Sequence, residues 1–514
     1  MEEKHIAAID LGTTKTSLLV AKIGGDNVQV VFYRHKPSAG IRNSNVFNPL
    51  LASAPVRELI REAEAELNIH LSWAVVGLPR YSVAQETATG ELVRTHPDDY
   101  ISREEIEILK EQALSNYPLS DSGSESIYGA VAQSFSTEDQ IQLVEDEVVG
   151  TLSPKVEGNF KIFIGKRSAG TAIDKVFNEL EIAVAKKYFL PDVVAKTVLF
   201  DEERQNGVAL VDIGGGVSSV AVYHGGIMRH YAAIPFGGKS ITTDIRTECS
   251  ISERLAENLK LAYGACIPGR LASLSEKTIQ IRYENSTYKE ISVKYLSEII
   301  DARSREIVDA ILYEIQQSGF QDFLRSGIVV TGGGAHLTNF NNLLKDVSGY
   351  NVRTGYPKFL FSASGCTGLY DPAATSAIGM VMAAKEDNLP DCAISPMVMF
   401  EEQPEPEPAM PAQQSWTPSE GQEYHETESE PADPVNNMTD EEFRKGETGT
   451  LIPQEEFGEI NVKVSPKRTG KRWRTGKQTD GEKKQDSGGN LKIIWKKLTD
   501  KVDDIYKTVT DEKI

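Results

Sequence analysis

The sequence predicts a mixed α/β body made of two related halves, followed by a disordered linker and a C-terminal amphipathic helix. Residues 1–386 alternate short apolar strands, glycine-rich turns and helical patterns such as APVRELIREAEAEL. The stretches 6–26 and 207–227 share one pattern, which indicates an internal repeat. Beyond Leu389 apolar runs become rare, and the increase in proline and charge marks the end of the folded body.

The composition limits what the protein can be. Its 514 residues, 40% of them hydrophobic, are enough for two or more domains. The formal net charge of −20 argues against general nucleic-acid binding, because phosphate binding needs a basic face. The four cysteines form no CxxC pair, so neither a zinc site nor a disulfide framework is indicated, and a reducing cytoplasm fits. No apolar run reaches about 18 residues and no signal-peptide core follows MEEKH, so we expect neither a membrane span nor export.

The repeated stretches, IAAIDLGTTKTSLLVAKIGGD and GVALVDIGGGVSSVAVYHGGI, each predict a β-hairpin with an aspartate beside its tight turn. Glycines let backbone N–H groups approach a phosphate closely, hydroxyl groups can donate hydrogen bonds to it, and Lys15 adds positive charge. Asp10 and Asp212 would face one gap from opposite halves, where they could hold Mg²⁺ through water. One such turn is more often structural, but two copies about 200 residues apart favour a phosphate site. The hydroxyl groups belong to Thr13, Thr14, Ser218 and Ser219.

A third glycine-rich turn lies in GIVVTGGGAHLTNFNNLLKDV, between a buried strand and apolar residues at helical spacing. Gly332, Gly333 and Gly334 would let a nucleoside lie against the backbone; alternatively, they serve packing in a strand-to-helix turn. Glu257 and Lys260, three apart on one predicted helical face, could reach ribose or adenine, or form only a solvated ion pair. Neither a Walker A nor a GxGxxG pattern occurs, which excludes P-loop and Rossmann sites.

Charge is segregated along the C-terminal region. Residues 401–460 carry 17 acidic residues, two basic residues and eight prolines, which predicts a self-repelling disordered linker. Residues 461–514 carry 15 basic and eight acidic residues, and the segment 463–484 is the basic end of the linker.

Residues 490–509, NLKIIWKKLTDKVDDIYKTV, place their apolar side chains in one helical stripe about 100° wide, with lysines beside it. This pattern is typical of a helix in a membrane interface, where the apolar face enters the acyl boundary and lysines meet anionic headgroups. Docking on its own domain or pairing as a coiled coil is the alternative, because three aspartates make the second half less suited to anionic lipid. The predicted membrane contacts are Leu491, Ile494, Trp495, Leu498 and Val502, with Lys492, Lys496 and Lys497.

The succession of a DxGT hairpin, a DxGGG hairpin and a TGGG turn before a helix resembles the actin, Hsp70 and sugar-kinase superfamily, in which a nucleotide lies between two RNase H-like halves. Within it, GVALVDIGGGVSSVAVYHGGIMRHYAAIPFGGKSITTDI specifically resembles the FtsA family of bacterial cell-division proteins. The resemblance covers roughly residues 4–385 and returns at the terminal helix. It implies an actin-like fold with subdomain inserts, a linker and a membrane-targeting helix.

The resemblance also implies how the chain is divided. Subdomain 1A would comprise residues 1–84, 163–198 and 361–386, and its insert, subdomain 1C, residues 85–162. Subdomain 2A would comprise residues 199–226 and 305–360, and subdomain 2B residues 227–304. Residues 387–489 would form the disordered linker and residues 490–509 the membrane helix.

By its motifs the family would bind ATP here, with magnesium at Asp10 and Asp212. The implied function is an ATP-binding protein that polymerises and anchors filaments of the tubulin-like protein FtsZ, the Z ring, to anionic lipid. Its place would be the cytoplasmic face of the inner membrane at the division site. The FtsZ C-terminal peptide would bind residues 227–304, and later division proteins residues 85–162. The ATP contacts would be Asp10, Gly12, Thr13, Thr14, Lys15, Asp212, Gly214, Gly215, Gly216, Glu257, Lys260, Gly332, Gly333 and Gly334.

The catalytic residues stay unassigned. In LPDVVAKTVLFDEE, the position at which Hsp70-like members can carry a water-orienting acid is Lys196 or Thr197, so we expect at most weak ATPase activity. A small-molecule kinase would need a carboxylate beside an acceptor pocket, and an Hsp70-like chaperone would need a β-rich substrate domain; the sequence indicates neither. A pilus-assembly actin homologue is the closest rival, but it would ordinarily lack the C-terminal helix.

Overall fold

Two β-sheets form the centre of the molecule. The computed structural model describes residues 3–282, 288–358, 360–363, 365–394 and 461–464. The first sheet has the strand order β11-β7-β1-β2-β3-β19, and the second has the order β14-β13-β12-β17-β18. The first comprises β1 (Lys4–Leu11), β2 (Lys15–Gly24), β3 (Asn27–Pro37), β7 (Trp73–Gly77), β11 (Ala183–Tyr188) and β19 (Ser362–Ala363). The second comprises β12 (Val208–Ile213), β13 (Ser218–His224), β14 (Ile227–Ile234), β17 (Ile328–Thr331) and β18 (Val352–Thr354).

The two sheets repeat one topology. In the first sheet, β1 pairs antiparallel with β2 and parallel with β7. In the second sheet, β12 pairs antiparallel with β13 and parallel with β17. Each hairpin continues antiparallel into a third strand, β3 or β14, and each parallel pair continues into β11 or β18. The structure therefore confirms the internal repeat and the two related halves that the sequence predicts.

The central strands are continuous apolar runs because helices pack on the sheets. All six residues of β12 are buried, and the five apolar ones lie in two cores with side chains of the helices. In the first half, α1 (Pro49–Leu67) packs on β2, β3 and α4 (Arg167–Asn178), while α11 (Thr375–Glu386) packs on β1 and α5 (Leu190–Val198). In the second half, α9 (Val293–Gln317) packs on β13 and α10 (Phe340–Ser348).

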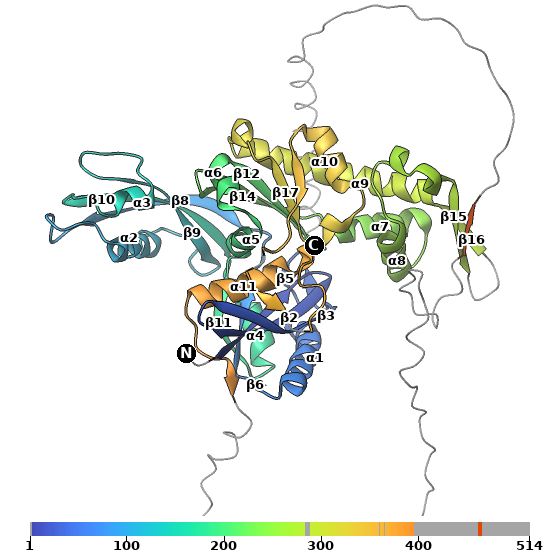
Figure 1. Ribbon diagram of the computed structural model, residues 1–514, viewed down its shortest axis with the longest axis horizontal. Coiled ribbons are helices and arrows are strands. Elements are labelled where there is room, and N and C mark those ends of the chain that lie inside the picture. The colour runs from blue at the N-terminus through green and yellow to red at the C-terminus, as the bar shows by residue number, and fades with distance from the viewer. Residues whose placement is uncertain (1–2, 283–287, 359, 364, 395–460, 465–514) are drawn as a thin grey trace, which may run out of the picture.

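A separate sheet with the order β8-β10-β9 projects from the first half, on the left of Figure 1. It comprises β8 (Ala84–Val93), α2 (Arg103–Ser115), β9 (Glu125–Ser136), α3 (Glu145–Val148) and β10 (Lys155–Lys166). This insert thus spans residues 84–166, against the predicted 85–162. Phe163 of β10 stacks on Phe189 with ring centroids 4.5 Å apart, which fixes the insert to the start of α5.

A second outer subdomain lies at the opposite end of the molecule, on the right of Figure 1. It comprises α7 (Gly238–Cys249), α8 (Glu253–Tyr263), β15 (Lys277–Arg282) and β16 (Tyr288–Ser292). Its predicted boundaries at 227 and 304 differ from the structure, because β14 begins at Ile227 and belongs to the second sheet, and α9 runs unbroken through 304.

Two short segments of the predicted linker form strands. β20 (Ala393–Ile394) pairs with β6 (His70–Leu71), and β21 (Asn461–Val464) pairs antiparallel with β15 at the edge of the outer subdomain. The prediction of disorder over 387–489 is wrong for these segments, because β20 forms a two-stranded sheet with β6 and β21 adds its backbone hydrogen bonds to the open edge of β15. Figure 1 shows β21, in red, at the edge of this subdomain beside β15.

The remaining short elements are β4 (Ile41–Arg42), β5 (Asn45–Val46) and α6 (Asp201–Asn206), together with 3-10 turns. Within the described part of the chain, no helix combines the length and apolarity needed to cross a membrane. The predicted membrane helix, residues 490–509, lies outside the described residues, as does most of the predicted linker.

Candidate functional site

The two predicted aspartates occupy equivalent places in the two hairpins. Asp10 is on β1 opposite Ser17 of β2, and Asp212 is on β12 opposite Ser219 of β13. Both lie near the carboxyl ends of strands that have a parallel neighbour, where ligands of α/β sheets commonly bind. Ser218 does not serve as a free donor, because its buried hydroxyl donates to the carbonyl oxygen of Phe236 at 2.9 Å.

The turns of the two hairpins, residues 12–15 and residues 214–216, are the two phosphate-type loops, and they contact each other. A Cβ atom on Gly215 would overlap the hydroxyl group of Thr14, and one on Gly216 would lie 2.8 Å from Thr13. In the first loop, a Cβ on Gly12 would lie 2.6 Å from the carbonyl oxygen of Lys15, so only glycine fits this tight turn. The sequence-predicted loop residues are therefore brought together from opposite halves.

The third glycine-rich turn packs on the end of β12. Gly332 has φ of 80°, and a Cβ there would overlap Oδ1 of Asp212; a Cβ on Gly334 would overlap the side chain of Ile213. Packing therefore accounts for two of the three glycines. Gly333 is different, because an added Cβ would have only Ala373 nearby, at 3.9 Å.

Glu257 and Lys260 are not a solvated ion pair. Lys260 Nζ lies 2.8 Å from Glu257, and it also donates to the carbonyl oxygen of Gly238 and the hydroxyl of Thr242, each at 2.9 Å. The Lys260 side chain is 12% exposed. Gly238 N–H in turn donates to the carbonyl oxygen of Gly214 at 3.0 Å, which connects this network to the second phosphate-type loop.

Burial dominates the electrostatics around the first loop. It raises the pKa of Asp10, against the opposing effect of the positive charges of Arg80 and Lys15. Burial also lowers the pKa of Lys15, although Asp10 and Asp371 counteract this. The negative charge of Asp212 contributes to the raised pKa of Asp10, so the two aspartates from opposite halves act on each other.

Sequence reasoning missed Arg80. Its Nη2 lies 3.0 Å from Oδ2 of Asp212 and donates to the hydroxyl of Ser376 at 2.6 Å. The sequence does contain a signal for Arg80, because this residue follows an apolar strand, β7. Strand β7 is parallel to β1, so the residues after β7 lie beside the Asp10 end of β1.

A cleft of about 490 Å³ adjoins the two loops. Thr13 and Gly216 line it from the loops, and the cations Arg42, Lys239 and Arg246 line it together with a single acid, Glu253. Glu253 is shared, because its carboxylate lies 3.2 Å from Lys239 and 3.9 Å from Arg246. The excess of positive charge suits an anionic ligand, and the volume is in the usual range for small-molecule sites.

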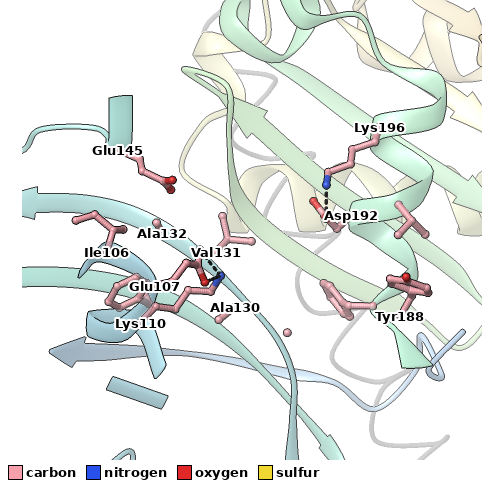
Figure 2. Close-up of a pocket in the computed structure, with 14 residues that line it drawn as sticks. Ile106, Glu107, Lys110, Ala130, Val131, Ala132, Glu145, Tyr188, Asp192 and Lys196 are labelled. Carbon is pink, nitrogen blue, oxygen red and sulfur yellow. Dashed lines mark hydrogen bonds and ion pairs between the residues drawn. The ribbon is translucent and has the colours of Figure 1, made fainter. Parts of the chain in front are cut away.

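Lys196 and Thr197, the predicted positions for a water-orienting acid, do not line this cleft. Lys196 pairs with Glu386 at 3.1 Å, and buried Thr197 donates to the carbonyl oxygen of Val193 at 2.8 Å. Lys196 lines another cavity, of about 290 Å³, between α5 and the insert. Figure 2 shows Lys196 and Asp192 facing the insert residues Val131 and Glu145 across this cavity.

The residues present do not fit a magnesium ion held next to both aspartates. Arg80 is paired directly with Asp212, and Lys15 is close enough to Asp10 to affect its pKa. Throughout the described ranges, no three His, Cys, Asp or Glu side chains are grouped so as to hold a metal ion. Magnesium therefore stays a prediction from the sequence.

The chain matches known cell-division proteins. The family model described as "Cell division protein FtsA" matches residues 209–379. The "Cell division protein FtsA" of Neisseria meningitidis is 28% identical over 396 residues, covering 76% of this chain and 92% of that protein. That of Pseudomonas aeruginosa is 26% identical over 381 residues, covering 74% of this chain and 89% of that protein.

A solved structure supports the fold. The "PilM-PilN type IV pilus biogenesis complex" matches with a TM-score of 0.51 and 14% identity, covering 74% of this chain and 98% of that one. At that identity the likeness concerns the fold alone. With the duplicated sheet and the sequence relatives, it leads to one conclusion: the chain has an actin-like fold and is similar, over about three quarters of its length, to the FtsA cell division proteins.

Proposed function

We propose that this protein binds ATP between its two halves, polymerises, and anchors FtsZ filaments to the cytoplasmic face of the cell membrane. The observation that carries the nucleotide part is the pair of equivalent aspartate hairpins, whose loops meet beside a cleft with three cations and one acid. Backbone N–H groups of such loops and the cations next to them are suited to a triphosphate.

Nucleotide binding would act on the whole molecule, because the two loops belong to different halves. A ligand that contacts both loops favours the arrangement in which the halves are closed together. If the closed arrangement presents the surfaces used in self-assembly, ATP favours filaments. The binding of ATP, and not its hydrolysis, would then drive assembly.

The membrane part is carried by the sequence of residues 490–509, and the partner surfaces are assigned by resemblance. We assign the FtsZ peptide to the outer subdomain of α7, α8, β15 and β16, and later division proteins to the insert of β8, β9 and β10. The direct test is co-sedimentation of FtsZ filaments with anionic liposomes. FtsZ should pellet with the lipid only when this protein and ATP are both present; pelleting that does not depend on the protein would contradict the proposal.

We predict slow turnover of ATP. The side chains at Lys196 and Thr197 are held by partners on α5 and α11, so neither provides a general base next to the loops. Phosphate release in steady state should lie well below the typical enzyme rate of about 10 per second. A rate of that order would show that another residue activates water.

We predict that salt weakens membrane binding. The basic segment 463–484 attracts an anionic surface by up to about 1 kcal/mol per nearby cation, whereas the acidic segment 401–460 is repelled. Raising the ionic strength from 0.1 to 1 M shortens the Debye length from about 10 to about 3 Å, so the bound fraction should fall while ATP binding changes little. Replacing Lys471, Arg472 and Arg474 with glutamine should remove part of this salt dependence; binding to liposomes that does not respond to salt would contradict the electrostatic contribution.

A further inference from the structure

Arg80 lies where the family resemblance expects magnesium. Its guanidinium is 3.0 Å from the carboxylate of Asp212 and within electrostatic range of Asp10. It is also close to the second loop, since a Cβ atom on Gly214 would be 3.9 Å from Nη1. The Arg80 and Asp212 side chains are 12% and 7% exposed, so this is an enclosed ion pair.

The charges already balance without a divalent ion. Two carboxylates, Asp10 and Asp212, lie near two cations, Arg80 and Lys15, and the further carboxylate that acts on Lys15, Asp371, has its own partner in His336 at 2.8 Å. A divalent cation between the carboxylates would bring a strong positive charge next to a buried guanidinium. It would also remove the partner of that guanidinium, and an unpaired buried charge is strongly unfavourable.

The backbone of Arg80 is fixed by contacts from both halves of the molecule. Its N–H donates to the hydroxyl of Ser44 at 3.2 Å, and its carbonyl oxygen accepts from the hydroxyl of Tyr231 at 2.7 Å. Ser44 also donates its N–H to Thr13 of the first loop at 3.0 Å. The guanidinium is thus held near both loops, and its planar fork can bind two phosphate oxygens as well as it binds a carboxylate.

We propose that Arg80 takes the place of magnesium at this site: it neutralises the two aspartates when no nucleotide is bound, and it contacts the terminal phosphates of bound ATP. ATP then binds without a divalent cation. This inference rests on the proposed nucleotide function, and it concerns which cation neutralises the aspartates and the phosphates at that site.

The test measures ATP affinity by calorimetry on the full-length protein, with millimolar Mg²⁺ and with EDTA in place of Mg²⁺. Wild type should bind equally well in both conditions, within about threefold. Arg80→Gln should bind about 10- to 100-fold more weakly in EDTA, as expected for a lost charge-assisted contact. Arg80→Lys should recover part of this loss. Arg229→Gln is the matched control, since Arg229 is a half-buried arginine that contacts Gln133 of the insert, away from the loops.

Wild-type binding that is at least about tenfold tighter with Mg²⁺ would overturn the inference and leave the proposed function intact. Unchanged affinity of Arg80→Gln in EDTA would overturn it as well. Failure of wild type to bind ATP in either condition would instead contradict the proposed function itself. The wild-type measurement is decisive even if Arg80→Gln does not fold.

Discussion

Replacing Asp212 with alanine is expected to abolish the stabilisation of the protein by ATP and to destabilise the nucleotide-free protein. The carboxylate is buried, leaves no room for a Cβ atom on Gly332 and pairs with Arg80 at 3.0 Å. Removing one partner of a buried ion pair leaves the other charge uncompensated, which typically costs about 3–5 kcal/mol. The free energy of unfolding should fall by about this amount in urea titrations without nucleotide.

Asp192→Ala is the matched control for this experiment. Asp192 also ends in a carboxylate paired with a cation, Lys196, but at 3.7 Å and with both side chains 43% exposed. Such surface pairs contribute about 0–1 kcal/mol, so this variant should keep wild-type stability and the full response to ATP. If Asp212→Ala retained the wild-type response to ATP, the assignment of the nucleotide to these loops would be wrong.

Replacing Trp495 and Leu498 together with glutamate is expected to detach the protein from anionic membranes. In the predicted helix both side chains belong to the apolar stripe of its basic half, where a tryptophan suits the headgroup boundary and a leucine reaches deeper. Each buried side chain is worth about 1.5–3 kcal/mol, and each new carboxylate is repelled by anionic lipid. The fraction that co-sediments with anionic liposomes should fall to near background.

Ile493→Glu is the control within the same helix, because Ile493 is an apolar residue on the predicted polar side. It should reduce binding far less than the double substitution. Binding of the double variant at the wild-type level would identify residues 490–509 as a docking or coiled-coil element. The protein would then lack the proposed membrane attachment, while its likeness to the FtsA proteins and the proposed nucleotide site would be unaffected.

The hairpins of the site could be predicted because their information is local. An apolar run, an aspartate and a glycine turn specify the end of a strand, and the same pattern recurs in the second half. The predicted boundary at 227 is wrong, although the pattern of the first half indicates the correct one. Gly24 and Gly25 precede the third strand of the first sheet, β3, and Gly225 and Gly226 precede the third strand of the second sheet, β14. A third strand was therefore to be expected after the second Gly-Gly turn.

The electrostatic partners of the site could not be predicted, because they come from tertiary contacts between distant segments. Arg80 and Asp212 are far apart in sequence, and no periodic pattern links them. Likewise, the spacing of Glu257 and Lys260 leaves open a nucleoside contact or a solvated ion pair, and it does not show that the packing of α8 on α7 brings Lys260 to Gly238 and Thr242. Charge balance in a cleft depends on which segments the fold brings together.

The pairing of β21 with β15 changes how far the end of the chain can extend from the body. Measured from Ile394, 95 residues precede residue 490, and a chain of that length can span at most about 340 Å. Measured from Val464, 25 residues precede it, and the limit falls to about 90 Å. Formation or release of this one short strand would therefore set the maximum height of the actin-like body above a membrane that holds residues 490–509.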